Sequence, residues 1–221
     1  MPTVVVILLT LLAAYLLGSI PSGYLAGRAR GIDIRAQGSG NIGATNVTRI
    51  LGKKIGILVL VTDAAKGWVS VYFIPRLVWW LFLIPEGSLL AEWLSITAGI
   101  GAVLGHNYTC WLNFKGGKGI ATSAGVMLGL VPFALVIVLA VFLVVLVTTR
   151  FVSLASISAS VTLPFATWLT GQKAALIAVT AGLGILAVFK HRTNIKRLLN
   201  RTEPRFGGSP ASKPALPSKS S

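Results

Sequence analysis

The 221-residue chain has few charged residues, and nearly all of those it has are basic. Charged side chains make up 11% of the sequence against 54% hydrophobic residues, whereas soluble globular chains carry about 25% charged residues. The mean hydropathy is +0.81, and the apolar residues occur in runs close to the roughly 20 residues that cross a bilayer core. The sequence therefore predicts an all-α integral membrane protein.

Cysteine, histidine and acidic residues are also scarce. Cys110 is the one cysteine in the sequence, which excludes an internal disulfide framework and a cysteine-rich zinc site. The two histidines are His106 and His191, and Trp111 and Lys196 stand where a His-x4-Asp general-base pair would need its acid. We expect no cofactor and no metal. So few carboxylates favour a mechanism built on oriented cations and backbone donors.

The basic excess of 20 Lys and Arg over 5 Asp and Glu does not indicate nucleic-acid binding. Nucleic-acid binders gather basic residues on a soluble face or helix, whereas here they lie in the gaps between apolar runs. We therefore expect no nucleic-acid partner and interpret the charge as a marker of the cytoplasmic side. No basic residue precedes Arg28, so the first run is expected to be a retained helix. The amino terminus is then outside and the carboxyl terminus cytoplasmic, with only Arg76 and Lys173 on the outer side.

The apolar runs predict about seven transmembrane helices in one multi-span domain at residues 1–203. The run at 118–131 is short and meets the next at Pro132, so a tight hairpin and a re-entrant element both fit it. Residues 76–87 are expected to form an interfacial segment on the outer side. Residues 204–221 are rich in Gly, Pro, Ser and Lys, which predicts a disordered cytoplasmic tail. The expected spans are 3–25, 55–75, 88–105, 118–131, 132–149, 152–170 and 172–190.

A first polar segment, residues 38–46, is followed by Arg49. Its letters match G-x-G-x-x-G, but that fingerprint requires a preceding strand, and a membrane helix is predicted here. Its three glycines, set among Ser, Asn and Thr, favour a backbone that presents N–H groups to an anion. A flexible connector is the alternative.

A second polar segment has lysines on both sides of a Gly-Gly pair at 114–119. A P-loop would need Gly at 112 and Ser or Thr at 119, where the chain has Leu112 and Gly119. Because the segment leads into a predicted helix, it remains a candidate phosphate cradle. Alternatively, Lys115 and Lys118 are positive-inside anchors.

A third polar segment, 191–197, ends the last predicted span. His191 and Asn194 should share one helix face, with Arg192 and Lys196 on another. A basic collar that snorkels to the membrane surface is the alternative. Within the second span, Asp63 and Lys66 either pair with one another or face the polar site.

These segments together resemble the bacterial membrane glycerol-3-phosphate acyltransferases that use acyl phosphate. Thr109 stands where that family usually has Pro, and 200–201 departs from its pattern before Glu203. The resemblance implies seven spans in the bacterial inner membrane and an active site at the cytoplasmic face. The matching stretches, in family order, are 18–23, 38–46 with Arg49, Asp63 with Lys66 and Gly67, Gly105 and His106, 114–122, and 191–199.

The resemblance also implies the reaction. A fatty acyl group would pass from acyl phosphate to the sn-1 hydroxyl of glycerol 3-phosphate, giving lysophosphatidic acid and phosphate. Membrane lipids and the enzyme that supplies acyl phosphate are further expected partners. The expected catalytic residues are Ser39, Arg49, Lys118 and His191, and the expected substrate-binding residues are Gly38, Gly40, Asn41, Thr45, Asn46, His106, Lys115, Gly116, Gly117, Gly119 and Asn194.

Two other classes of function also fit a basic membrane protein. A transporter of an anionic or phosphorylated solute would use helix amino termini in a similar way, but should show half-to-half symmetry around a midplane site. A scaffold that binds anionic lipid would leave the Ser, Asn and Thr content of the first segment unexplained. Within the enzyme class, acyl-CoA is the alternative donor.

Overall fold

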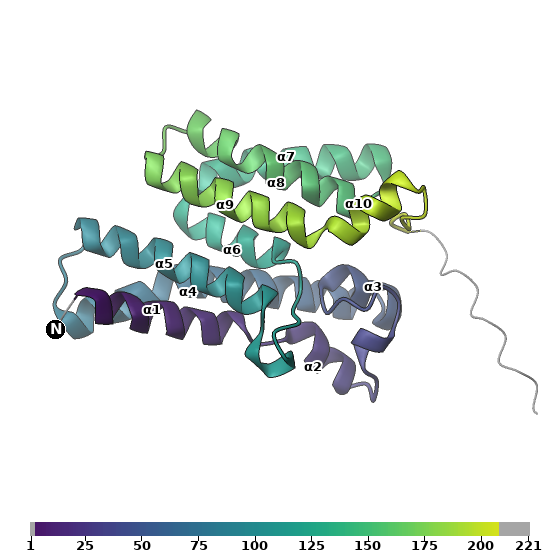
Figure 1. Cartoon of the computed structure of the whole chain (residues 1–221), viewed down its shortest axis with the longest axis horizontal. Helices are drawn as coiled ribbons and strands as arrows, with labels where there is room; N and C mark the ends of the chain where they lie inside the picture. The colour runs from purple at the N-terminus through teal and green to yellow at the C-terminus, as the bar shows by residue number, and fades with distance from the viewer. Residues whose placement is uncertain (1–2, 208–221) are drawn as a thin grey trace, which may run out of the picture.

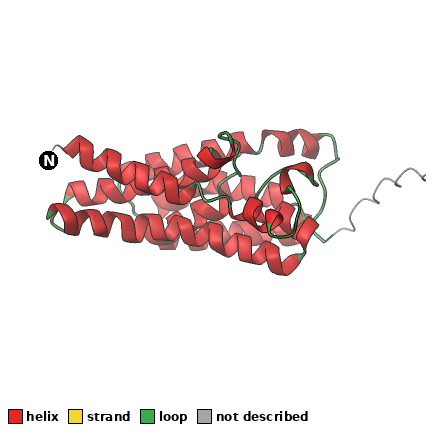
Figure 2. Cartoon of the chain, turned by 90° about the horizontal axis from the view of Figure 1, so that it is seen from below, coloured by secondary structure: helices red, strands yellow, loops and turns green. Residues whose placement is uncertain are grey.

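The computed structural model describes residues 3–207, and every regular element in that range is helical (Figures 1 and 2). The end of the chain beyond Gly207, which makes up most of the predicted tail, lies outside the described residues. The elements are α1 (Thr3–Gly18), α2 (Ser22–Arg28), η1 (Ile34–Ala36), α3 (Ala44–Leu51), α4 (Lys53–Phe82), α5 (Leu89–Asn107), η2 (Cys110–Leu112), α6 (Ile120–Leu130), α7 (Pro132–Thr149), α8 (Val152–Leu169), α9 (Ala174–Lys190) and α10 (Arg192–Leu199).

Five stretches of the described chain are long and apolar enough to cross a membrane. A sixth is added if α9 and α10, which meet at a bend of 56°, count as one span. Helix α6 has 11 residues and so reaches about 16 Å, roughly half of a 30 Å hydrocarbon core. The expected span at 118–131 is therefore too short to cross alone, and the count of seven stays a prediction. The five stretches are Thr3–Arg28, Lys53–Phe82, Leu89–Leu112, Pro132–Thr149 and Val152–Leu169.

Helix α4 differs from its expected length. The sequence predicted a span ending near residue 75 and a separate interfacial segment after it, but the helix continues through Pro75 to Phe82. Proline removes one backbone hydrogen bond, and membrane helices tolerate this loss where neighbouring groups compensate. Pro75 is buried within the bundle, so the helix is packed where its backbone is weakest.

The helices form two groups with α6 between them (Figure 1). Helices α1, α4 and α5 lie on one side, and α7, α8 and α9 lie on the other. One apolar core joins the groups, since it takes Val71 from α4, Val103 from α5, Met127 from α6, Leu135 from α7 and Leu163 from α8. The short helix α6 is thus held at the centre of the bundle.

Small residues allow α6 to approach α4 closely, as in other membrane helix pairs. A Cβ atom added to Gly67 would overlap the carbonyl oxygen of Thr122, and one added to Gly125 would overlap that of Ala64. These contacts fix where the amino terminus of α6 points.

The short helices α2, α3 and α10 gather at one end of the bundle, away from the amino terminus of the chain (Figure 1). The perpendicular view shows the same arrangement, with loops concentrated at that end (Figure 2). The segments that carry the polar residues therefore meet at one end of the long helices.

Candidate active site

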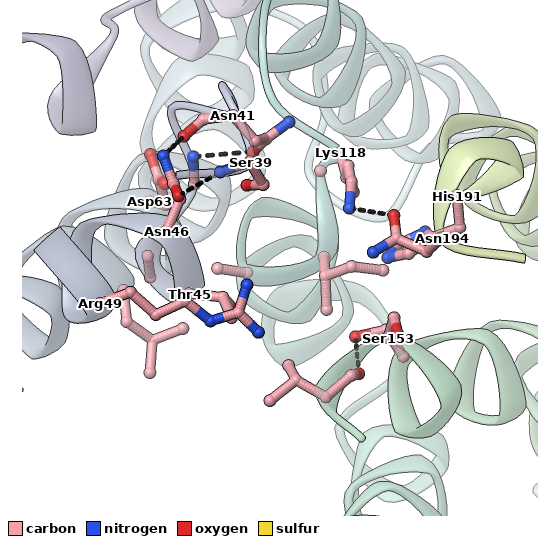
Figure 3. Close-up of a pocket in the computed structure, with 18 of the residues that line it drawn as sticks. Ser39, Asn41, Thr45, Asn46, Arg49, Asp63, Lys118, Ser153, His191 and Asn194 are labelled. Atoms are coloured by element: carbon pink, nitrogen blue, oxygen red, sulfur yellow. Dashed lines mark hydrogen bonds between the residues drawn. The ribbon is translucent and has the colours of Figure 1, made fainter. Parts of the chain in front are cut away.

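A cavity of about 140 Å³ lies where the three polar segments meet (Figure 3). Its wall also includes Asp63 from α4 and Ser153 and Ser156 from α8. Five of the residues expected from the sequence do not line it: Gly38, Gly40, Lys115, Gly116 and Gly117. The expected residues that do line it are Ser39, Asn41, Thr45, Asn46, Arg49, His106, Lys118, Gly119, His191 and Asn194.

Asn46 organises the first segment. Its side chain is 2% exposed, and its amide nitrogen donates to the carbonyl oxygens of Ile34, Gln37 and Asn41 at 3.3, 3.1 and 2.9 Å. Its Oδ1 accepts from the Ser39 N–H at 2.9 Å. Asn46 is therefore the anchor of the loop and presents Ser39 and Asn41 to the cavity.

Steric contacts explain why the residue before Ser39 is a glycine. Gly38 has a φ of +56°, and a Cβ there would lie 2.5 Å from the Asn46 Oδ1, closer than real Cβ contacts. A side chain at this position would both strain the backbone and displace the anchor. The role of Gly38 is thus to shape the loop.

Two helix amino termini border the cavity. Helix α3 begins after Gly43, whose N–H donates to the Asn41 side chain at 2.8 Å, and it turns both Thr45 and Arg49 toward the cavity. Helix α6 begins after Gly119, which has a φ of +81°, and its first residues also line the wall. Free N–H groups and the helix dipole make such ends favourable for anions.

Lys118 lies in the connection between α5 and α6, and its ammonium donates to the Asn194 side-chain oxygen. The Asn194 amide in turn donates to Glu203 at 2.7 Å, and Arg197 donates to the other Glu203 oxygen at 2.6 Å. Burial lowers the pKa of Lys118 to about 8, although the Glu203 carboxylate opposes this shift. An anion placed beside Lys118 would restore its preference for the charged form.

Arg49 and His191 supply two further nitrogen-bearing groups. The Arg49 guanidinium donates to the carbonyl oxygen of Pro204 at 3.3 Å, and burial lowers its pKa. The His191 Nδ1 lies 2.7 Å from the Ala187 carbonyl oxygen. Because a carbonyl can only accept, Nδ1 carries the proton, and Nε2 is the nitrogen left for a ligand.

The Gly-Gly pair of the second segment serves the site indirectly. The N–H groups of Gly116 and Gly117 donate to the carbonyl oxygens of Asn107 and His106 at 3.2 and 3.0 Å, so they are already engaged. A Cβ on Gly117 would overlap the His106 ring. Lys115 is exposed outside the cavity. In this conformation, the anion-facing groups of the segment are Lys118 and the start of α6.

Local spacing in the sequence missed a histidine–acid contact. The His106 Nδ1 lies 3.5 Å from the Asp63 Oδ1, and the same oxygen accepts from the Ser22 hydroxyl at 2.6 Å and pairs with the Lys66 ammonium at 2.9 Å. The two residues lie on different helices, so no spacing rule finds them. The available signal was an acid inside an apolar span.

Glu203 and Arg197 were also not expected to line the site. Glu203 lies at the predicted domain boundary, yet it is 9% exposed and fixes Asn194. Its signal was a single acid beside a strongly basic segment. Among residues 3–207, no group of three or more His, Cys, Asp and Glu side chains is arranged to hold a metal ion.

The arrangement as a whole brings several cations and two helix ends to one small cavity, which suits a ligand carrying phosphate. A family model described as "Glycerol-3-phosphate acyltransferase" matches residues 8–201 of the chain. The chain belongs to the glycerol-3-phosphate acyltransferase family. It is therefore a membrane acyltransferase of phospholipid biosynthesis. The alternative function, a transporter, is not favoured.

Individual relatives agree with the family match. The glycerol-3-phosphate acyltransferase of Geotalea daltonii is 46% identical over 196 residues, which cover 89% of this chain and 95% of that protein. The glycerol-3-phosphate acyltransferase of Geobacter sulfurreducens is 44% identical over 193 residues, covering 87% and 94%.

Two solved structures share the fold. Both are crystal structures of PlsY (YgiH), described as an integral membrane glycerol 3-phosphate acyltransferase, at 38% identity. The glycerol 3-phosphate form gives a TM-score of 0.80 and covers 91% of this chain and 96% of that chain. The lysophosphatidic acid form gives 0.78, with 91% and 95% covered.

Proposed function

We propose that this glycerol-3-phosphate acyltransferase takes its acyl group from a fatty acyl phosphate. The acyl group passes to the sn-1 hydroxyl of glycerol 3-phosphate, and the products are lysophosphatidic acid and phosphate. The observation that carries the proposal is the convergence of Arg49, Lys118 and His191 on one cavity bordered by two helix amino termini. Such a cavity matches a reaction in which both substrates carry phosphate.

The acceptor phosphate is assigned to Arg49 and His191, which line the cavity from α3 and from the junction of α9 and α10. A guanidinium binds phosphate through paired N–H groups, and the His191 Nε2 is oriented for a ligand by the Ala187 contact. Ser39 and Asn194 orient the attacking hydroxyl. The PlsY structures in glycerol 3-phosphate and lysophosphatidic acid forms are consistent with this acceptor and product.

The donor phosphate is assigned to Lys118 and the amino terminus of α6. Lys118 is held by Asn194, so its ammonium is oriented before substrate arrives. Gly119, Ile120 and Ala121 line the same wall and place the end of α6 beside the phosphate. Preorganised charge of this kind is the largest catalytic contribution in many enzymes.

The chemistry asks little of a protein base. The glycerol oxygen attacks the acyl carbonyl carbon, the bond between that carbon and the phosphate oxygen breaks, and phosphate leaves with the bonding pair. The hydroxyl proton passes to a substrate phosphate oxygen. The protein's part is to orient two anions and to stabilise the charge that develops on the carbonyl and on the leaving phosphate.

The acyl chain is assigned to a second, apolar cavity of about 70 Å³ between α6, α7, α8 and α9. It shares Ile120, Phe142 and Ser156 with the polar cavity, so the two adjoin. Its far end is lined by buried side chains of the core: Met127, Leu135, Leu163 and Leu183.

We further propose seven spans, an outside amino terminus and a cytoplasmic active site in the bacterial inner membrane. The support is the distribution of Lys and Arg. In addition, the three polar segments gather toward one end of the bundle (Figure 1). A cytoplasmic site also places the cavity within reach of the enzyme that supplies acyl phosphate.

The donor is tested with purified protein, glycerol 3-phosphate and either palmitoyl phosphate or palmitoyl-CoA, with product and released phosphate both followed. We expect turnover with palmitoyl phosphate and stoichiometric phosphate release. Turnover with palmitoyl-CoA alone would replace the proposed donor and leave the family assignment intact.

A further inference from the structure

The strongest group outside the proposed substrate contacts is the buried cluster around Asp63. The Asp63 and Lys66 side chains are 2% and 4% exposed and form an ion pair at 2.9 Å. Lys66 also donates to the Ile20 carbonyl oxygen at 2.8 Å, and Ser22 donates to Asp63. The cluster thus ties α4 to the connection between α1 and α2.

The cluster reaches the active site through His106. The His106 ring is 5% exposed, and its Nδ1 faces the Asp63 carboxylate at 3.5 Å. That nitrogen makes no hydrogen bond within the described chain, and the Asp63 carboxylate is the acceptor that it faces at this longer distance. Rotation of the ring is therefore restrained by its electrostatic contact with Asp63.

The opposite edge of the His106 ring lies against Gly117. A Cβ on Gly117 would overlap Nε2, Cε1 and Cδ2 of the ring, so the chain passes directly over the imidazole. The His106 carbonyl oxygen also accepts the Gly117 N–H at 3.0 Å. Ring and carbonyl together determine the path of Gly117, and Lys118 is the next residue.

We infer that Asp63 and His106 are positioning residues for Lys118. Asp63 holds the His106 ring, the ring and carbonyl of His106 hold Gly117, and Gly117 directs the Lys118 ammonium toward the donor phosphate. Asn194 holds the ammonium from the other side of the cavity. This inference rests on the proposed function, because it assigns Lys118 to the donor. It also explains why a His next to an acid borders the site without supplying a base.

The test separates the hydrogen-bond acceptor at position 63 from the buried charge. Asp63→Leu with Lys66→Met removes both the charge pair and the acceptor. Asp63→Asn with Lys66→Met removes the same charge pair but keeps an oxygen for the His106 Nδ1. Removing both charges together avoids an unpaired buried ion.

We expect the leucine double variant to lose about 10- to 100-fold in kcat with palmitoyl phosphate, the scale of a misplaced catalytic group. The KM for glycerol 3-phosphate should change little, and the asparagine double variant should keep most of its activity. In a Lys118→Ala background, the leucine pair should lower kcat by less than a further factor of about three, because all these variants act through Lys118. Equal losses in the two double variants, or additive losses with Lys118→Ala, would overturn the inference.

A second measurement does not depend on acyl transfer. With Cys110→Ser and Lys118→Cys, the alkylation rate of the thiol reports where position 118 lies. The rate should change several-fold with the leucine pair and stay unchanged with the asparagine pair. An unchanged alkylation rate in both pairs contradicts the positioning role, whichever donor the enzyme uses. If the rate changes but the protein with Lys118 intact does not turn over palmitoyl phosphate, the result counts against the proposed donor alone.

Discussion

The Lys118 ammonium donates a hydrogen bond to the Asn194 side chain across 76 residues of sequence. The contact joins the second polar segment to the third over the cavity, and Glu203 supports it by accepting from Asn194. The site therefore joins side chains from two distant segments of the chain, and its charge is arranged before substrate binds.

The pH dependence of turnover should follow Lys118. Because burial lowers its pKa to about 8, the ammonium is charged below that pH and neutral above it. We expect kcat/KM for acyl phosphate to fall as pH rises through about 8, with the fall in kcat displaced to higher pH because bound phosphate favours the charged form. In Lys118→Arg, which stays charged, the fall near pH 8 should be absent. A profile that keeps this fall in Lys118→Arg assigns it to another group.

Asn46→Ala should disorder the first segment. The change removes a side chain that makes four hydrogen bonds within the loop and leaves the Ser39 N–H without its acceptor. We expect a loss of about 1 to 3 kcal/mol in the free energy of unfolding, the range for an unsatisfied buried group. The KM for glycerol 3-phosphate should rise as well.

Thermal unfolding in detergent and substrate titration measure the two effects. Asn41→Ala serves as the matched control, because it removes one such bond, to the Gly43 N–H, and should unfold closer to the unmodified protein. Equal stability of Asn46→Ala and the unmodified protein would contradict the anchoring role.

The far end of the apolar cavity should limit acyl-chain length. Met127 is 2% exposed there, and Met127→Trp would shorten the space, whereas Met127→Ala would lengthen it. Each buried methylene contributes about 0.8 kcal/mol. If a variant changes the chain length that the cavity accepts by two methylenes, the preference for palmitoyl over decanoyl phosphate should change by roughly 10- to 20-fold. The measurement is kcat/KM for decanoyl against palmitoyl phosphate. Unchanged preference in both variants places the acyl chain elsewhere.

The orientation is testable with single cysteines after Cys110→Ser. Arg30→Cys and Glu86→Cys are at exposed positions near opposite ends of the bundle. We expect a membrane-impermeant maleimide to label position 86 from outside intact cells and position 30 only after permeabilisation. The reverse pattern would invert the proposed topology.

Much of the fold followed from the sequence because long apolar runs leave few alternatives in a bilayer. The runs that became α7 and α8 had the expected bounds within a few residues. The end of α4 was predicted too early, because the helix continues through the buried Pro75 to Phe82. The length of α6 was uncertain from sequence, since Gly119 and Pro132 limit it at both ends.

The site was predictable where the residues lie on one local element. The shared face of His191 and Asn194 was confirmed, because both are buried against the cavity while Arg192 and Lys196 are exposed. The contact of His106 with Asp63 was not found, because it depends on how α4 packs against α5. Likewise, the hydrogen bond from the Gly117 N–H to the His106 carbonyl oxygen depends on the path of a loop. The sequence does not determine that path, because glycine allows many backbone conformations.

Turnover of Lys118→Ala against Lys115→Ala tests the central claim most directly. Lys118 lines the cavity, whereas Lys115 lies exposed outside it, so the pair compares charge at the phosphate with charge at the membrane surface. Loss of the Lys118 cation should remove about 2 to 4 kcal/mol of transition-state stabilisation, a roughly 30- to 1,000-fold fall in turnover. Lys115→Ala should stay within about threefold of the unmodified protein, as expected of a surface anchor. Near-normal turnover in folded, membrane-inserted Lys118→Ala, or a larger loss in Lys115→Ala, would contradict the account.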